Sequence, residues 1–218
     1  DIEENAQRMK DYFFTDFAAK VTQCIYEVAE KRKSGAFLIA GRPGFGKTHL
    51  TLFLNNFFRL DINDQVFKII ENIVGKMPLR KMKEKIGRFL SLNPVPIVNQ
   101  AEPKFDSTLI TALNSALSRE AVDFIPNPTG TASEIFDETI TYLREQSKYR
   151  GIVITLDNME SIIADIEKGE ESPLVKQVIS FFQYIRSLDN FPVIFIGNTS
   201  FYTNNYATAS LEEDAIEK

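Results

Sequence analysis

The sequence predicts an α/β fold in which helices cover both faces of a central parallel sheet. Short apolar segments, typical of buried strands, alternate along the chain with longer segments whose apolar residues recur at helical spacing. This alternation favours parallel strands joined by right-handed crossovers. A length of 218 residues is enough for one large α/β domain, or for one domain with an appendage. Such sheets bind ligands at the carboxyl ends of their strands, so functional residues are expected there.

Helices are predicted where apolar residues recur at intervals of three or four. The predicted helices are 11–33, 48–58, 64–77, 79–90, 106–121, 131–149 and 173–188. Ser34 and Gly35 end the first helix, and Pro78 separates the third from the fourth. Pro173 is well placed in the first turn of the last helix, since that position needs no hydrogen-bonded N–H.

Strands are predicted at the short apolar segments. They are 36–40, 95–99, 151–156 and 191–196. The unbroken apolar run 151–156 is typical of a strand buried on both faces, and Pro96 makes 95–99 a candidate edge strand. The chain is therefore expected to have three parts. Residues 1–34 form an N-terminal helix that packs on the core, and 35–200 form the core, with a helical insertion at about 61–92. Residues 201–218 form a polar tail or the start of a lid that lies outside this chain.

Composition indicates a soluble intracellular protein. The chain is 44% hydrophobic and 25% charged, and its formal net charge of −5 argues against a surface that is basic all over, while leaving room for a basic patch. Cys24 cannot form an internal disulfide and is expected to be buried and inert, which suits a reducing compartment, the nucleus or cytoplasm. No apolar run approaches the ~20 residues of a membrane helix, and no signal peptide is recognised. Because the chain starts with Asp1, a processed product or a piece of a longer protein is expected.

The segment Gly41-Arg42-Pro43-Gly44-Phe45-Gly46-Lys47-Thr48 fits the phosphate-binding pattern G-x-x-x-x-G-K-[ST] at every fixed position. It lies between a predicted strand and a predicted helix, so backbone N–H groups and the helix N-terminus can surround a phosphate. Lys47 is expected to reach the β- and γ-phosphates, and the Thr48 hydroxyl to bind Mg²⁺. An ordinary glycine turn is the alternative. ATP and Mg²⁺ are the expected cofactors, and 41–49 is the expected binding segment. Within it, His49 is expected to be a packing or surface residue and not a catalytic base.

Two later strands end in polar residues. Asp157 follows 151–156 and is expected to bind Mg²⁺, although a helix cap is the alternative. Next comes Asn158, where ATPases of the additional-strand class usually carry a Glu that polarises water. An amide cannot accept a proton from water, so slow hydrolysis is predicted. Glu160 is a substitute candidate, but a solvated carboxylate at a helix start is favoured. Asn198 follows 191–196 and is expected to lie between the phosphate-binding segment and the strand that ends in Asp157. There it would contact the γ-phosphate or its water, and a simple turn is the alternative.

Together these segments resemble an AAA+ ATPase, and their order resembles the Orc/Cdc6 initiator group. The group's LDE-x-D-x-L pattern corresponds here to 156–162, and its sensor-1 strand end to 196–199. The run 46–50 is also similar to that of bacterial initiators, helicase loaders and phage-defence ATPases. The resemblance implies a P-loop NTPase core, other AAA+ subunits as partners, ATP as an assembly switch, and a place in a DNA-associated machine. It also implies catalytic roles for Lys47, Asp157, Asn158 and Asn198.

The chain departs from this family in three respects. Asn158 replaces the usual Glu, and the segment between the phosphate loop and 95–99 is long and helical. No arginine follows Arg186, so the arginine finger and the sensor-2 arginine would have to come from a neighbour or from a lid outside this chain. The sequence therefore predicts an incomplete hydrolytic site.

A basic run supplies a candidate surface for DNA. Its members are Lys76, Arg80, Lys81, Lys83, Lys85 and Arg88. A solvated amphipathic helix is the favoured interpretation, and a contact for DNA phosphates or for an acidic partner is the alternative. Two other functions stay open: a P-loop small-molecule kinase, in which Arg144 and Arg150 supply charge, and an inactive scaffold subunit that binds ATP for structure only.

Overall fold

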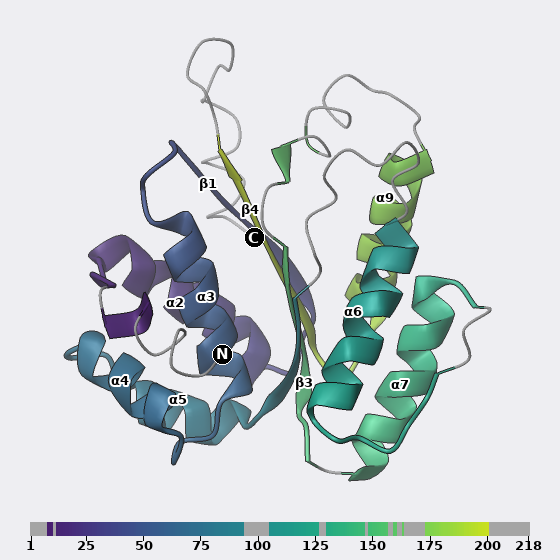
Figure 1. The fold of residues 1–218 in the computed structure, drawn as a ribbon, viewed down its shortest axis with the longest axis horizontal. Helices are drawn as coiled ribbons and strands as arrows, with labels where there is room; N and C mark the ends of the chain where they lie inside the picture. Colours follow the sequence, from purple (N-terminus) through teal and green to yellow (C-terminus); the bar gives the residue numbers. More distant parts are fainter. Residues whose placement is uncertain are drawn as a thin grey trace.

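A computed structural model describes residues 8–10, 12–93, 105–126, 130–146, 148–156, 159–160, 163 and 173–200. Within them, a four-stranded parallel sheet lies between two helical layers (Figure 1). One layer contains α2 (Asp16–Glu30), α3 (Lys47–Arg59), α4 (Gln65–Ile73) and α5 (Leu79–Ile86). The other contains α6 (Phe105–Arg119), α7 (Ala132–Gln146) and α9 (Pro173–Ser187). The predicted three-layer α/β fold is confirmed. No helix of the described part is long and apolar enough to cross a membrane.

The strands are β1 (Gly35–Gly41), β2 (Phe89–Leu92), β3 (Gly151–Leu156) and β4 (Val193–Ser200). Their order in the sheet is β1-β4-β3-β2, and every neighbouring pair is parallel. Strand β4, the last in sequence among the described residues, therefore lies between the strand that leads into the phosphate loop and the strand that precedes Asp157. In this register Ile39 pairs with Asn198, and Leu156 pairs with Gly197.

Each face of the sheet carries its own hydrophobic core. On the α3 side, Phe53, Leu54, Phe57 and Phe58 are fully buried and pack toward Val153 of β3. On the other side, alternate residues of β3 pack against α6, α7 and α9. Every residue of β3 is buried, as its apolar sequence predicted. The sheet is thus held rigidly from both sides, which fixes the positions of its strand ends.

The helix predicted over 79–90 is wrong in its last residues. Helix α5 ends at Ile86, since Gly87 takes the left-handed φ of 72° that ends a helix. Phe89–Leu92 then form β2, which pairs with β3. The helical insertion expected at about 61–92 therefore includes a strand of the sheet. The strand predicted over 95–99 lies outside the described residues.

The N-terminal segment also differs from its prediction. Helix α2 begins at Asp16, because the Thr15 side chain caps it by accepting a hydrogen bond from the Ala18 N–H at 3.1 Å. Phe13 lies before this helix and is 82% exposed. Cys24, expected to be buried, is exposed.

Candidate functional site

The phosphate loop joins the carboxyl end of β1 to the start of α3. Gly44 and Gly46 have φ angles of 83° and 75°, in the region that favours glycine. A Cβ added at either glycine would meet nothing within 4 Å, so backbone conformation, rather than crowding, requires glycine there. The Gly46 carbonyl accepts the first helical hydrogen bond of α3, from the Leu50 N–H at 2.9 Å. The loop therefore directs the start of α3 toward the carboxyl edge of the sheet, as a phosphate site requires.

Lys47 folds back across the beginning of this loop. Its Nζ donates hydrogen bonds to the carbonyls of Gly41 and Arg42, at 2.9 and 2.8 Å. An ammonium group has three donors, so one remains for a phosphate oxygen while the loop carbonyls hold the other two. Thr48 is exposed on the first turn of α3. The ammonium group of Lys47 suits a phosphate oxygen, and the hydroxyl group of Thr48 suits the cation that accompanies a nucleotide phosphate.

An aromatic pocket of about 360 Å³ adjoins the loop, and we call it the loop pocket. Phe45 and His49 line it from the loop side, and Tyr12, Phe13 and Phe17 from the N-terminal segment. The rings of Tyr12 and His49 stack with their centroids 6.0 Å apart and their planes 7° apart. Burial raises the pKa of Tyr12 to about 12, so it stays neutral at physiological pH. The sequence did not predict this pocket, because it placed the N-terminal aromatic residues in a core-facing helix.

Asn198 is buried within β4 and not exposed in a turn, because β4 continues to Ser200. Its Nδ2 donates to Thr51 Oγ1 at 3.3 Å, one turn along α3 from Lys47. Its carbonyl accepts a hydrogen bond from the Met159 N–H at 2.9 Å. Asn198 therefore links the phosphate-loop helix to the segment that follows β3. Whether it contacts a γ-phosphate stays a prediction.

Asp157 and Asn158 lie outside the described residues. Of their described neighbours, Glu160 is not a simple solvated carboxylate: its Oε1 accepts a hydrogen bond from the Ser200 N–H at 2.6 Å. Ser200 pairs with Gly41, where the phosphate loop begins. A carboxylate therefore lies at the carboxyl edge of the sheet, close to the end of β1.

A buried polar cluster connects α3 to the carboxyl ends of β2 and β3. Asn55 Nδ2 lies 2.7 Å from Ser91 Oγ, 2.6 Å from Asn93 Oδ1 and 3.1 Å from Thr155 Oγ1. Thr155 Oγ1 also donates to Asn93 Oδ1 at 2.9 Å. This cluster fixes α3 over the strands that flank the site. The sequence contains only one hint of it, a polar Thr155 inside an otherwise apolar strand.

The basic run is largely occupied by internal contacts. Arg80 pairs with Glu71, Lys85 with Glu30 and Arg88 with Glu120, while Lys83 is buried. Lys76 and Lys81 are the exposed members for which no partner is found in the described ranges. The favoured interpretation, a solvated amphipathic helix, therefore holds only in part, because Lys83 is buried and three members of the run are in ion pairs. These contacts leave little of the run open for DNA.

No protein-family model matches the chain, and no curated protein matches it significantly. Among solved structures, it is similar to the ORC2 protein of Aeropyrum pernix in its ADPNP and ADP complexes. The two chains are 14% identical with a TM-score of 0.48, over 84% of this chain and 40% of the other. The chain thus spans well under two thirds of that protein's length.

Proposed function

We propose that this chain binds ATP and Mg²⁺ at the phosphate loop. The observation that carries the proposal is the conformation of the loop itself: left-handed Gly44 and Gly46 lie between a parallel strand and a helix N-terminus, with Lys47 held across the loop. Thr48 and Asp157 are the proposed Mg²⁺ ligands. The ion would neutralise phosphate charge between them.

In this proposal the nucleotide base occupies the loop pocket. The pocket adjoins the phosphate loop, and its volume and aromatic walls suit a planar ring. Phe13 and Phe45 are 82% and 75% exposed, so their faces are open to stacking. His49 would contribute through its stack on Tyr12 and not by accepting a proton in catalysis.

The wider role we propose is that of an AAA+ type domain in a DNA-associated machine, initiator-like or loader-like, with ATP as a switch for assembly with other AAA+ subunits. Its intrinsic hydrolysis would be weak, since Asn158 cannot accept a proton from water. A phage-defence ATPase would use the same site chemistry. A direct DNA contact through the basic run would depend mainly on Lys76 and Lys81.

The arrangement of the arginines does not favour a small-molecule kinase. The guanidinium of Arg144 donates to the Asp189 carbonyl at 2.7 Å, and Arg150 directly precedes β3. Both side chains lie at the amino edge of the sheet, and the phosphate loop lies at the carboxyl edge. They are therefore badly placed to contact a transferred phosphoryl group.

A titration with labelled ATP tests the binding site. Wild-type protein should bind ATP in a Mg²⁺-dependent manner, and Lys47→Ala should abolish binding, because the variant loses the phosphate-contacting ammonium. Lys68→Ala is a matched control, since Lys68 is an exposed lysine on α4 away from the loop. Equal affinity in Lys47→Ala and wild type would refute the assignment of the site.

A further inference from the structure

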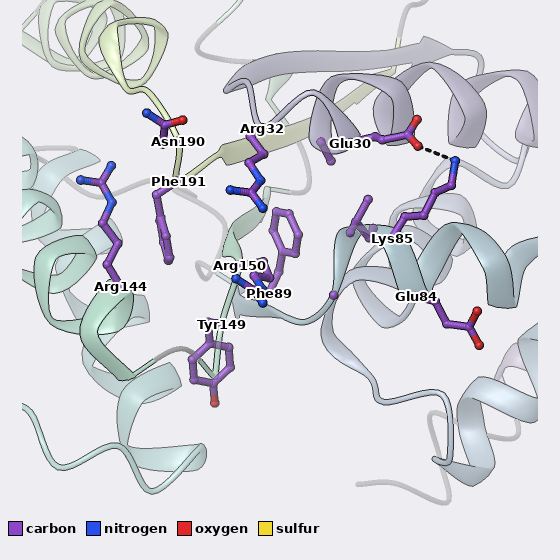
Figure 2. A pocket seen from close by; sticks show the side chains of 13 residues that line it. Glu30, Arg32, Glu84, Lys85, Phe89, Arg144, Tyr149, Arg150, Asn190 and Phe191 are labelled. Atoms are coloured by element: carbon purple, nitrogen blue, oxygen red, sulfur yellow. Dashed lines mark hydrogen bonds and ion pairs between the residues drawn. The ribbon is translucent and has the colours of Figure 1, made fainter.

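A second pocket lies at the amino edge of the sheet, and we call it the amino-edge pocket (Figure 2). Its volume is about 330 Å³. Residues at or shortly before the start of each of the four described strands line it: Arg32 near β1, Phe89 in β2, Arg150 before β3 and Phe191 near β4. Strand β1 runs from this edge to the phosphate loop, a distance of roughly 20 Å at the usual rise per residue. The two pockets are therefore separate.

Positive charge predominates in the amino-edge pocket, although the whole chain carries −5. Its charged lining residues are Glu30, Arg32, Glu84, Lys85, Arg144 and Arg150. Lys85 is neutralised by Glu30, whose Oε1 lies 2.7 Å from its Nζ. The guanidiniums of Arg32 and Arg150, in contrast, have no hydrogen-bond or ion-pair partner within the described ranges. Figure 2 shows both residues at the pocket; Arg32 comes from the turn after α2 and Arg150 from the segment before β3.

Arg32 occupies a backbone position that normally belongs to glycine. It follows the C-cap of α2 with a φ of 56°, and Lys33 closes the helix by donating from its N–H to the Val28 carbonyl at 3.1 Å. Glycine is the usual residue at this place in such a helix ending, because a Cβ is unfavourable there. A strained non-glycine residue that directs a cation into a pocket suggests a role for its side chain beyond the fold.

Arg150 is held in place by the backbone of Gly87. A Cβ added at Gly87 would lie only 2.7 Å from Arg150 Cγ, so the aliphatic part of the arginine passes closely over the glycine. Gly87 has a φ of 72°, which further disfavours any side chain. The stem of Arg150 is thus positioned, while its guanidinium is exposed at the pocket.

We propose that the amino-edge pocket binds a small oxyanion, a phosphate or carboxylate group, between Arg32 and Arg150. Two unpaired cations that enter one pocket repel each other, and an anion between them would remove that repulsion. The planar guanidinium fork matches both phosphate and carboxylate groups in bidentate geometry. The volume leaves room for a small organic body attached to the anionic group.

Calorimetric titration of Lys47→Ala protein at low ionic strength tests this proposal, because that background removes the binding of phosphate at the loop. Pyrophosphate and citrate are the probes for the two anion classes. Binding of one of them identifies the class, and binding of both indicates a general oxyanion site. Adding Arg32→Gly or Arg150→Gln should weaken binding by about tenfold or more, since each removes a charge-assisted contact. Arg186→Gln, which replaces an exposed arginine on α9, is the control and should bind unchanged.

Arg32→Gly separates binding from folding. Because glycine is favoured at a φ of 56°, this variant should unfold at the same temperature as its parent or at a higher one. Loss of binding in a protein that is at least as stable supports the site. The proposal is overturned if neither probe binds at millimolar concentrations, or if the Arg32 and Arg150 variants bind as tightly as the Arg186 control.

Discussion

Lys83 should make the stability of this protein depend on pH in a way that one substitution removes. The side chain is 3% exposed, and its Nζ donates to the carbonyl of Phe58 at 2.6 Å. Phe58 lies in the last turn of α3, where carbonyls have no partner within the helix. Burial lowers the pKa of Lys83 from 10.5 to about 7, because the charged ammonium is poorly solvated.

The sign of the effect follows from proton binding. Between pH 7 and 10.5 the unfolded chain holds the Lys83 proton and the folded protein largely releases it, so the free energy of unfolding rises with pH. With these two pKa values, the free energy of unfolding rises by about 5 kcal/mol at most as the pH passes from below 7 to above 10.5. At pH 7 the protein is still about 4 kcal/mol less stable than it would be with Lys83 fully neutral. Lys83→Met removes the charge but leaves the Phe58 carbonyl without a donor, which costs about 1–3 kcal/mol.

Two stability curves that cross are therefore expected. Lys83→Met should equal or exceed wild type in the free energy of unfolding at pH 7, and should fall below wild type near pH 10, where Lys83 is neutral and still donates its hydrogen bond. Urea unfolding at several pH values measures both curves, and their difference cancels the other titrating groups. Lys81→Met, an exposed neighbour on α5, should leave the pH dependence unchanged. Parallel curves for wild type and Lys83→Met would refute the reasoning.

Three further outcomes are expected. Asn55→Leu should lower the free energy of unfolding in urea by about 2–4 kcal/mol, because it removes the buried amide that donates to the side-chain oxygens of Ser91, Asn93 and Thr155 and puts an apolar group among them; an unchanged midpoint would show that the cluster is not needed. Phe13→Ala should weaken ATP binding several-fold without affecting pyrophosphate binding at the loop, and an equal loss for both would place the base elsewhere. Asn158→Glu should raise single-turnover ATP hydrolysis, and rapid hydrolysis by the unaltered chain would contradict the role given to Asn158.

Much of the α/β pattern was predictable because its signals are local. The unbroken apolar run of β3, the periodic apolar residues of α3 and the glycines of the phosphate loop each reflect a requirement that neighbouring residues impose. Gly44 and Gly46 illustrate the point: their positive φ angles follow from the turn itself, and the motif that encodes the turn is visible in eight consecutive letters. Lys47 was placed with them because it occupies the fixed lysine position of the same motif, and in the structure it begins the helix that the loop leads into.

Only the tertiary structure decided which distant segments meet. Phe89 and Leu90 continue a helical pattern in the sequence, yet Phe89–Leu92 forms a strand because β3 offers it a hydrogen-bonding edge. Long-range packing likewise closes the loop pocket and brings Arg32 and Arg150 to one pocket from different elements. Such encounters depend on the order of strands and the packing of helices, which no local window of sequence contains. The sequence by itself determined that a loop with the phosphate-binding pattern lies on an α/β sheet. The fold determined which side chains surround that loop and which gather at the opposite edge, because strand order and helix packing bring together residues far apart in the chain.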